Sequence, residues 1–228
     1  MNLGTLSTRT LTRLDEVSTN PEFYGSAVSA INWAQRMFVL LSLPLETTAT
    51  FDLTAVTTWY HARDQFTDWL LPLRVDFDGT KVRPATLAQL DDLDAAWQAK
   101  PGNPERYAHL GLDLLALYKQ VGDADTLSLT YARGPVPLVA AADTPEIPEE
   151  YHPLLIDGAI VYLRMVEGGQ EFAKVQPLLG EFLSGARKLG NYVRQRSKDL
   201  RYDSFPVELT KLDLSRVLAI EKKGPSNG

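Results

Sequence analysis

The chain has 228 residues, of which 44% are hydrophobic and 23% are charged, with a formal net charge of −6 and no cysteine. This length and composition are typical of a folded protein with one larger domain or two small ones. The mild negative charge argues against a protein whose main task is to grip nucleic acid, because that task requires clustered cations. Without cysteine, disulfides and thiolate metal sites are excluded.

Neither an export signal nor a membrane span is expected. The first fifteen residues lack the apolar core of a signal peptide. The longest apolar run, Met37–Leu45, is interrupted by Ser42 and Pro44. It is also well short of the roughly 20 residues that a helix needs to cross a bilayer. We therefore expect a soluble protein that makes no membrane contact.

Two helices are predicted in the first 42 residues. Apolar residues three apart indicate a short helix over residues 3–17. Asn20-Pro21-Glu22 then provides a helix start, because Asn accepts from free N–H groups, Pro suits the first position and Glu favours the positive end of the dipole. Apolar residues continue at helical spacing, and this second helix should end near Ser42, before Pro44.

The apolar period then changes from helical to two, which is typical of strands. Strand-like segments cover residues 46–53, 56–62, 71–77, 112–118 and 127–133. The first two of these segments can form a hairpin, and Asp78-Gly79 favours a second tight hairpin after the third. A short helical stripe covers residues 87–97. Together these segments predict an antiparallel sheet inserted between helices.

Helical spacing returns at Pro148. Glu149 and Glu150 lie in the first turn, where the helix dipole favours carboxylates. Gly168-Gly169 permits a reversal, and the helix after it carries an apolar seam that can pack on a partner helix. Pro177 lies inside that seam and should kink the helix or divide it into two.

These elements predict an α+β fold: a helical bundle formed by N-terminal and C-terminal helices, with an inserted antiparallel β-sheet domain and an extended C-terminal tail. We assign residues 1–43 plus 146–200 to the helical bundle domain. Residues 44–145 form the inserted β-rich domain, and residues 201–228 form the extended tail. The helical domain is therefore expected to be discontinuous in sequence.

The tail is the first candidate interaction segment, because it is far more apolar than a typical disordered end. Its candidate partner-binding residues are Tyr202, Phe205, Val207, Leu209, Leu212, Leu214, Val217 and Leu218. Val207/Leu209 and Leu212/Leu214 alternate with polar neighbours. The tail either adds as a strand or clamp to a neighbour, or packs on its own domain. We favour binding to a neighbour, because a tail that follows a complete helical hairpin has little core left to join.

A basic set before the tail is the second candidate. It consists of Arg187, Lys188, Arg194, Arg196, Lys198 and Arg201. These cations are candidate contacts with DNA phosphates or with an acidic partner. The alternative is that they complement the dipole at a helix C-terminus. We favour this alternative, because the chain as a whole is acidic.

No catalytic or metal-binding pattern is present in the sequence. It contains no nucleophile elbow, phosphate-binding glycine loop or dinucleotide fingerprint. His61, His109 and His152 are far apart and lack ligands at metal-binding spacing, so we interpret them as structural. A hydrolase would need a pair such as Asp157 or Glu167 near His152, which nothing in the spacing favours. We expect no catalytic residue, no metal site and no cofactor.

A different class of function is a ligand- or carbohydrate-binding β module on a helical scaffold. In that case the sheet would present Trp59, Tyr60, Trp69 and Tyr107 on one exposed face. Aromatic side chains of this size are more often buried, and we expect these four to lie mostly in the core.

Several short patches, in order, resemble the head-to-tail connector proteins of tailed bacteriophages, also called adaptor or neck proteins. The patches are Ala30–Gln35, Glu46–Phe51, Leu87–Asp91 with Trp97, Gly102–Tyr107, Leu129–Arg133 and Ile147–Leu155. The resemblance extends from about Leu3 to Glu208. No single patch is specific, and it is their order and spacing that carry the similarity.

The resemblance implies a structural virion protein without enzymatic activity. It implies a helical bundle with a β insert, and a ring of twelve copies that docks under the portal, extends the DNA channel and provides the platform for tail attachment. Partners would be other copies of the chain, the portal, tail or nozzle proteins and, transiently, packaged DNA. The implied location is the virion neck, after assembly in the host cytoplasm.

Overall fold

The computed structural model describes residues 1–16, 20–167 and 169–199. Its residues divide into two compact units. Unit 1 contains Met1–Pro44 and Pro135–Gln195, and unit 2 contains Leu45–Gly134 with the end of the last helix from Arg196 on. The first is helical and the second is built on a sheet, so the α+β class predicted from the sequence is confirmed.

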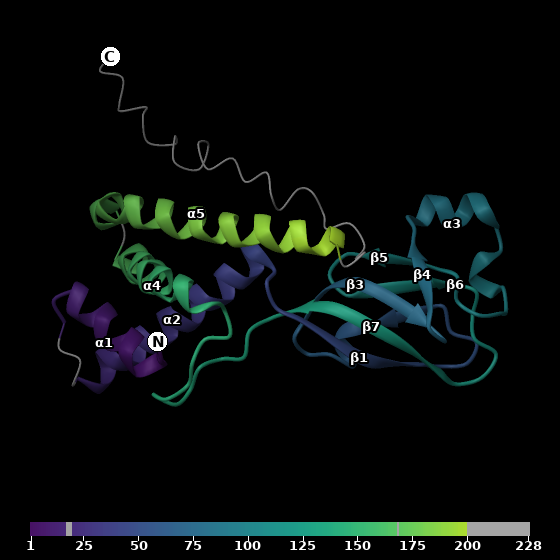
Figure 1. Ribbon diagram of the computed structural model, residues 1–228, viewed down its shortest axis with the longest axis horizontal. Helices are drawn as coiled ribbons and strands as arrows, with labels where there is room; N and C mark the ends of the chain where they lie inside the picture. The colour runs from purple at the N-terminus through teal and green to yellow at the C-terminus, as the bar shows by residue number, and fades with distance from the viewer. Residues whose placement is uncertain (17–19, 168, 200–228) are drawn as a thin grey trace, which may run out of the picture. The chain divides into compact units, whose positions relative to one another are not determined.

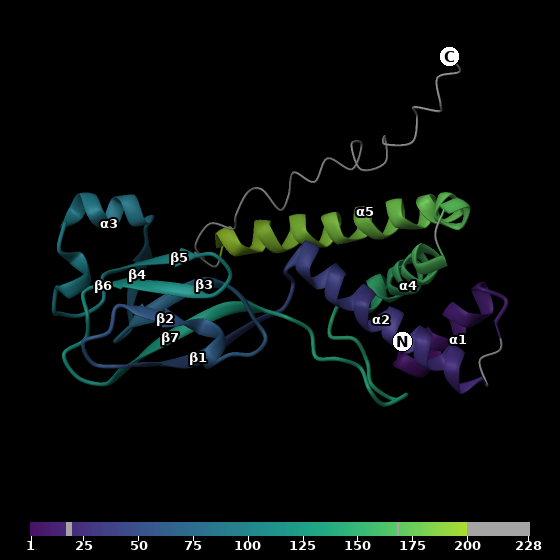
Figure 2. The same ribbon diagram turned by 180° about the vertical axis from the view of Figure 1, so that it is seen from behind.

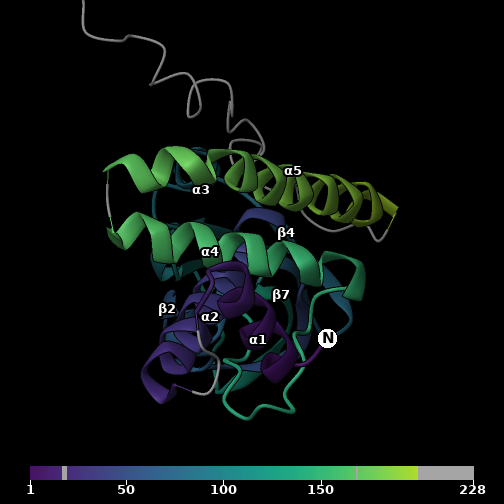
Figure 3. The same cartoon turned by 90° about the vertical axis from the view of Figure 1, so that its left-hand side faces the viewer.

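Unit 1 is a bundle of four helices (Figure 1). They are α1 (Leu3–Arg13), α2 (Pro21–Ser42), α4 (His152–Glu167) and α5 (Gly169–Asp199). Seen from the helical end, α4 lies between α5 and the pair formed by α1 and α2 (Figure 3). Helices from the two ends of the chain therefore share one core.

The ends of α2 follow from local chemistry. The Asn20 side chain accepts a hydrogen bond from the Glu22 N–H at 3.0 Å, and Pro21 occupies the first helical position. The helix ends where Leu43 adopts a left-handed conformation with φ of 50°. Both ends lie where the sequence predicts them.

Small residues allow the helices of unit 1 to pack closely. A Cβ atom added at Gly158 of α4 would lie 2.7 Å from the Phe182 ring of α5 and 3.0 Å from Ala34 of α2. The rings of Phe182 and Phe38 meet edge to face at 5.5 Å. Glycine at position 158 is therefore what lets α4 approach both neighbours.

Pro177 does not divide the last helix, because α5 is continuous from Gly169 to Asp199. The alternative that Pro177 splits it in two is therefore wrong. Pro177 is exposed. Its ring therefore stays off the buried face of α5, which includes Val175 and Phe182.

Residues 135–145 cluster with the helices, although the sequence places them in the insert. The Asn32 side chain donates to Leu138 O at 2.9 Å and accepts from Leu138 N at 2.8 Å. The Gln35 side chain donates to Val136 O at 2.9 Å. Side chains of α2 hold this extended segment, a pairing that local sequence does not reveal. A short 3₁₀ turn, Glu149–Tyr151, then leads into α4.

Unit 2 contains one curled, seven-stranded sheet (Figures 1 and 2). Its strands are β1 (Glu46–Leu53), β2 (Trp59–His61), β3 (Trp69–Phe77), β4 (Thr80–Pro84), β5 (Arg106–Leu110), β6 (Leu114–Tyr118) and β7 (Asp125–Arg133). The strand order is β1-β7-β3-β4-β5-β6-β2. The two edges are therefore β1 and β2.

The pairing differs from the sequence prediction in three respects. Residues 56–62 do not pair with β1. Instead β2 pairs with β6, and β1 pairs with β7. The sheet is mixed, because β4 and β5 run parallel. Strand β5 is not among the segments that the sequence predicts, because it follows the Pro101–Pro104 loop and its apolar alternation is weak. The β3–β4 hairpin through Asp78-Gly79 is confirmed, with positive φ at both residues.

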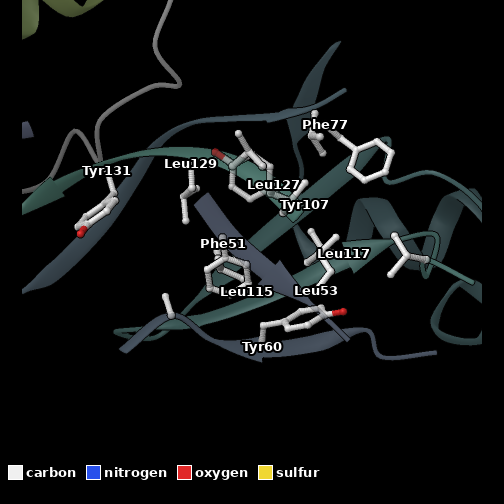
Figure 4. Packing of buried hydrophobic residues seen from close by; sticks show 14 of the residues in the cluster. Phe51, Leu53, Tyr60, Phe77, Tyr107, Leu115, Leu117, Leu127, Leu129 and Tyr131 are labelled. Carbon is white, nitrogen blue, oxygen red and sulfur yellow. The ribbon is translucent and has the colours of Figure 1, made fainter. Parts of the chain in front are cut away.

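The core of unit 2 is enclosed by the curled sheet (Figure 4). Phe51, Leu115 and Leu127, from three different strands, are almost fully buried in it. A second cluster joins α3 (Leu87–Leu93) to the sheet through Leu90 and Trp97. Alternate residues along each strand therefore point into this core, as the two-residue period of a strand requires.

Across the part of the chain that the structure describes, no helix is long and apolar enough to cross a membrane.

Candidate interaction surfaces

The basic residues of α5 lie away from its buried face. That face consists of Val175, Phe182, Ala186 and Leu189, which are at most 6% exposed. Arg187 and Lys188 are exposed. The predicted apolar seam is therefore confirmed for these four residues, and it turns the adjacent cations toward solvent.

Two further cations of the set are engaged with neighbouring groups. Arg194 Nε donates to the Gly190 carbonyl at 3.3 Å, and its Nη2 donates to the Asn191 side chain. Arg196 Nη2 lies 3.2 Å from Glu46 Oε1. The side chain of Lys198 and all of Arg201 lie outside the described residues. Among the described side chains of this set, Arg187 and Lys188 are thus the best placed to meet an external partner.

Helix geometry separates these two cations. Residues seven apart lie on nearly the same side of an α-helix, so Arg187 and Arg194 share one side. Lys188 is turned by about 100° from Arg187. The structure therefore arranges the cations around the solvent side of α5 and does not gather them in one compact patch.

The apolar tail lies outside the described residues, and so do all eight of its candidate partner-binding residues. The described chain ends at Asp199, within α5. The candidate role of the tail therefore depends on its sequence and on the surfaces that the described units offer to it.

The outer edge of β1 is a surface that sequence reasoning missed. Arg133 N donates to Leu45 O at 3.0 Å, so the peptide groups of odd-numbered residues face β7. Those of even-numbered residues face away from the sheet. Within the described residues, the outward peptide groups of Thr48 and Thr50 have no hydrogen-bond partner. Only the tertiary structure reveals this edge, because a strand is identified as an edge strand by its pairing.

One end of this edge is closed by a side chain. Asp52 N donates to Gln65 Oε1 at 2.8 Å, and Gln65 Nε2 donates to Asp52 O at 3.0 Å. The Gln65 amide thus satisfies both outward groups of one residue, as a neighbouring strand would. The open part of the edge is limited to the residues before Asp52.

Each histidine contacts groups of its own unit. His152 is 1% exposed, and its Nδ1 lies 2.8 Å from the Met1 amine while its Nε2 lies 3.0 Å from Ile147 O. His61 Nδ1 lies 3.4 Å from Asp113 Oδ2. Burial lowers the pKa of His109. No group of three residues suited to holding a metal ion occurs among the described residues.

Asp157, one of the two carboxylates considered for a hydrolase, is held in an ion pair. Asp157 Oδ1 is 2.5 Å from Arg13 Nη1, and this ion pair occupies the carboxylate. The side chain of Glu167 lies outside the described residues. His152 is instead taken up by the backbone and terminal contacts given above.

The aromatic residues proposed for a ligand-binding face lie in the core, as expected. Tyr60, Trp69 and Tyr107 are 7%, 1% and 3% exposed. Trp59 is half-buried, with its ring 5.6 Å from that of Trp97. Carbohydrate recognition by stacking requires exposed rings, so these four residues do not support a carbohydrate-binding module.

Comparison with known proteins identifies the family. A family model described as SU10 adaptor protein matches residues 1–204, which is most of the chain. A search of curated proteins gave no match. Members of this family are structural head-to-tail adaptors of bacteriophages and hence virion components that interact with other virion proteins. The matched residues include the helical bundle and the whole sheet, and the match agrees with the resemblance seen in the sequence. The chain therefore belongs to the SU10 adaptor protein family.

Proposed function

We propose that the protein forms a ring under the portal that extends the DNA channel and provides the platform for tail attachment. The observation that carries this proposal is the family match over residues 1–204. The helix–sheet–helix order described above supports it. The ring would contain twelve copies, as the resemblance to connector proteins implies, and would be part of the virion neck after assembly in the host cytoplasm.

A ring imposes a requirement on the subunit surface. Each copy must present two different faces that fit each other, because head-to-tail contacts close into a ring. We propose that the helical bundle domain and the β-rich insert act as separate domains that supply such faces. The portal would bind one side of the ring, and tail or nozzle proteins would bind the other.

The decisive experiment mixes the purified protein with the portal protein of the same virus. Rings of the protein attached to the portal should be visible by electron microscopy, and the symmetry of class averages gives the number of copies. The protein alone is a suitable control, since it is expected to assemble only on the portal. Failure to associate with the portal in any buffer would rule the adaptor role out.

The exposed cations of α5 are proposed to contact passing DNA. Arg187 and Lys188 are exposed, and Arg187 shares one side of the helix with Arg194, so a polyanion can reach them. Such contacts would be weak and independent of sequence, because phosphate contacts position DNA without reading it. A weak hold suits a channel through which DNA has to move.

Replacing Arg187 and Lys188 by Ala should weaken DNA binding by assembled rings equally for all sequences. The dependence of affinity on salt should also become shallower, because fewer counterions are released on binding. The matched control replaces Arg63 and Arg83, two exposed cations of unit 2. Binding is measured by fluorescence anisotropy over a salt series. Equal effects of the two double substitutions would refute a specific role for α5.

A further inference from the structure

We infer that the open edge of β1 receives residues 210–215 of a neighbouring copy as an added strand. The inference rests on the ring of the proposed function and names the contact that joins its subunits. It combines an unpaired edge of the described sheet with a segment of this chain beyond the described residues.

Strand β1 has the features of an edge that can pair with another strand. It pairs with β7 over eight consecutive residues, Glu46–Leu53, without a register shift. It contains no proline, and its charged residues lie only at Glu46 and Asp52. A long, regular edge without proline, bulge or central charge is a template for pairing with another chain. In both ribbon views β1 lies outermost, beside β7 (Figures 1 and 2).

The other edge of the sheet is protected in a way that β1 is not. Strand β2 has three residues, Trp59–His61, and a short edge offers little backbone for pairing. On β1, the Gln65 amide protects only Asp52. Thr48 and Thr50 are exposed, and both have a side chain that suits a strand. This contrast between the two edges indicates that β1 can pair with an added strand at the residues before Asp52.

The two faces beside the open edge differ in polarity. Thr48 and Thr50 lie on the exposed face, where Thr48 Oγ1 is 2.8 Å from Thr130 Oγ1. Ala49 and Phe51 lie on the face that packs in the core, and Ala49 is only partly buried there. An added strand should therefore carry apolar residues on one side and polar residues on the other.

Residues 210–215 have this pattern. Leu212 and Leu214 alternate with Lys211, Asp213 and Ser215. If the odd-numbered residues turn their peptide groups toward β1, their polar side chains lie beside Thr48 and Thr50. Leu212 and Leu214 then lie on the core side, beside Ala49. The segment contains no proline, so every peptide group that faces β1 can donate.

The ring favours a neighbouring copy as the source of this strand. An edge on one subunit and a segment on the next are two different surfaces, which is the arrangement that head-to-tail closure needs. The segment also lies beyond residues 1–204, the part matched by the adaptor family. The contact would thus be an addition of this chain to a family fold, made through backbone hydrogen bonds.

Cysteine cross-linking tests the contact directly, because the chain has no cysteine of its own. One preparation carries Thr48→Cys, and a second carries Lys211→Cys, Asp213→Cys or Ser215→Cys. In the proposed strand, paired residues have Cα atoms about 5.5 Å apart, within disulfide range. Assembly of the mixture on the portal should yield disulfide-linked dimers. Leu212→Cys is the matched control and should not cross-link, because its side chain lies on the other face.

Substitutions at the edge provide an independent test. Thr48→Pro removes an N–H that has no partner in the described units, and should lower assembly on the portal by about tenfold or more. Thr48→Val keeps the N–H and should assemble normally. Circular dichroism checks that each variant is folded. Should Thr48→Pro fail to fold, the pair Leu212→Asp/Leu214→Asp disrupts the contact from the tail side, with Lys211→Ala/Asp213→Ala as its control.

The outcomes separate this contact from the adaptor role. Cross-links between preparations support the inference. A third preparation carries both Thr48→Cys and Asp213→Cys in one chain. If cross-links form only within that chain and never between preparations, the segment pairs with β1 of its own chain and the inference is overturned. Normal assembly on the portal without any cross-link would overturn it as well, while leaving the adaptor role intact. If the protein does not bind the portal but still cross-links between copies, the adaptor role fails and the strand contact stands.

Discussion

At the residue scale, two side-chain amides replace backbone partners. Asn32 bonds both the N–H and the C=O of Leu138, and Gln65 does the same for Asp52. A primary amide has the same donor and acceptor spacing as a peptide group, so it can complete a segment that has no neighbouring strand. Asn32 thereby holds the extended segment of unit 1, and Gln65 closes one end of the β1 edge.

Another residue-scale feature is the buried phenol of Tyr131. Burial, and then a hydrogen bond to Asp68 at 3.0 Å, raise the pKa of Tyr131 to about 12. Its ring stacks on Phe66 at 4.8 Å and lies 5.1 Å from Trp69. The ionised form is therefore disfavoured in the folded protein.

This shift predicts a loss of stability at high pH. Tyrosine has a pKa of about 10 when unfolded. Because the folded value is higher, the stabilisation is fully present below pH 10 and is lost as the pH rises toward 12. We expect a loss of about 1 to 3 kcal/mol over this range. Urea unfolding at several pH values measures it.

Tyr131→Phe removes the ionisation and keeps the ring. The variant should be less stable than the wild type near pH 8 by about 1 kcal/mol, because the Asp68 hydrogen bond is lost. It should also lose less stability between pH 10 and 12. Tyr192→Phe, at a position that is 65% exposed, is the control. Identical pH profiles for Tyr131→Phe and the wild type would show that this phenol is not responsible.

At the element scale, glycines in the helices of unit 1 have two different roles. Gly158 lies where α4 touches Phe182 and Ala34. Gly180 lies in α5 with nothing within 4 Å of an added Cβ. Glycine costs a helix about 1 kcal/mol relative to alanine, so its presence at position 158 is explained by close packing. No contact in the described structure explains glycine at position 180.

Alanine substitution should therefore have opposite effects at these two positions. Gly158→Ala should lower the free energy of unfolding by about 1 to 3 kcal/mol, because the methyl group meets the Phe182 ring and Ala34. Gly180→Ala should raise it by about 0.5 to 1 kcal/mol through helix propensity. Urea denaturation followed by far-UV circular dichroism measures both. A stabilising effect at position 158 would contradict the close packing of α4 on α5.

At the scale of the whole molecule, the described residues form two compact units. The helical unit draws its elements from both ends of the described chain, and the sheet unit is inserted between them. Each unit has its own buried cluster among the described residues.

Removing residues 203–228 should leave both units folded and weaken assembly. The thermal unfolding midpoint should change by no more than a few degrees, because the described residues of each unit already pack into a buried cluster of their own. Binding to the portal, or ring formation on it, should fall. Calorimetry measures the first effect and electron microscopy the second. An unfolded truncated protein would show instead that the tail belongs to the protein's own core.

Elements whose signals lie in neighbouring residues could be predicted from the sequence. The Asn20-Pro21 start of α2, the Asp78-Gly79 hairpin and the apolar seam of α5 depend on neighbouring residues, and all three were predictable. The short patches were also enough to suggest the adaptor family, and the family match agrees.

The tertiary structure alone decided which strands pair and which edge stays open. Pairing joins residues far apart in the chain, such as Thr48 with Thr130, and several partners satisfy the same alternating pattern. For this reason the β1–β7 pair, the parallel β4–β5 pair and the Gln65 amide that closes the edge could not be derived from the sequence. Neighbouring residues determine where helices and strands form. Hydrogen bonding between distant backbone groups determines which strands pair, and therefore which edge remains for a partner.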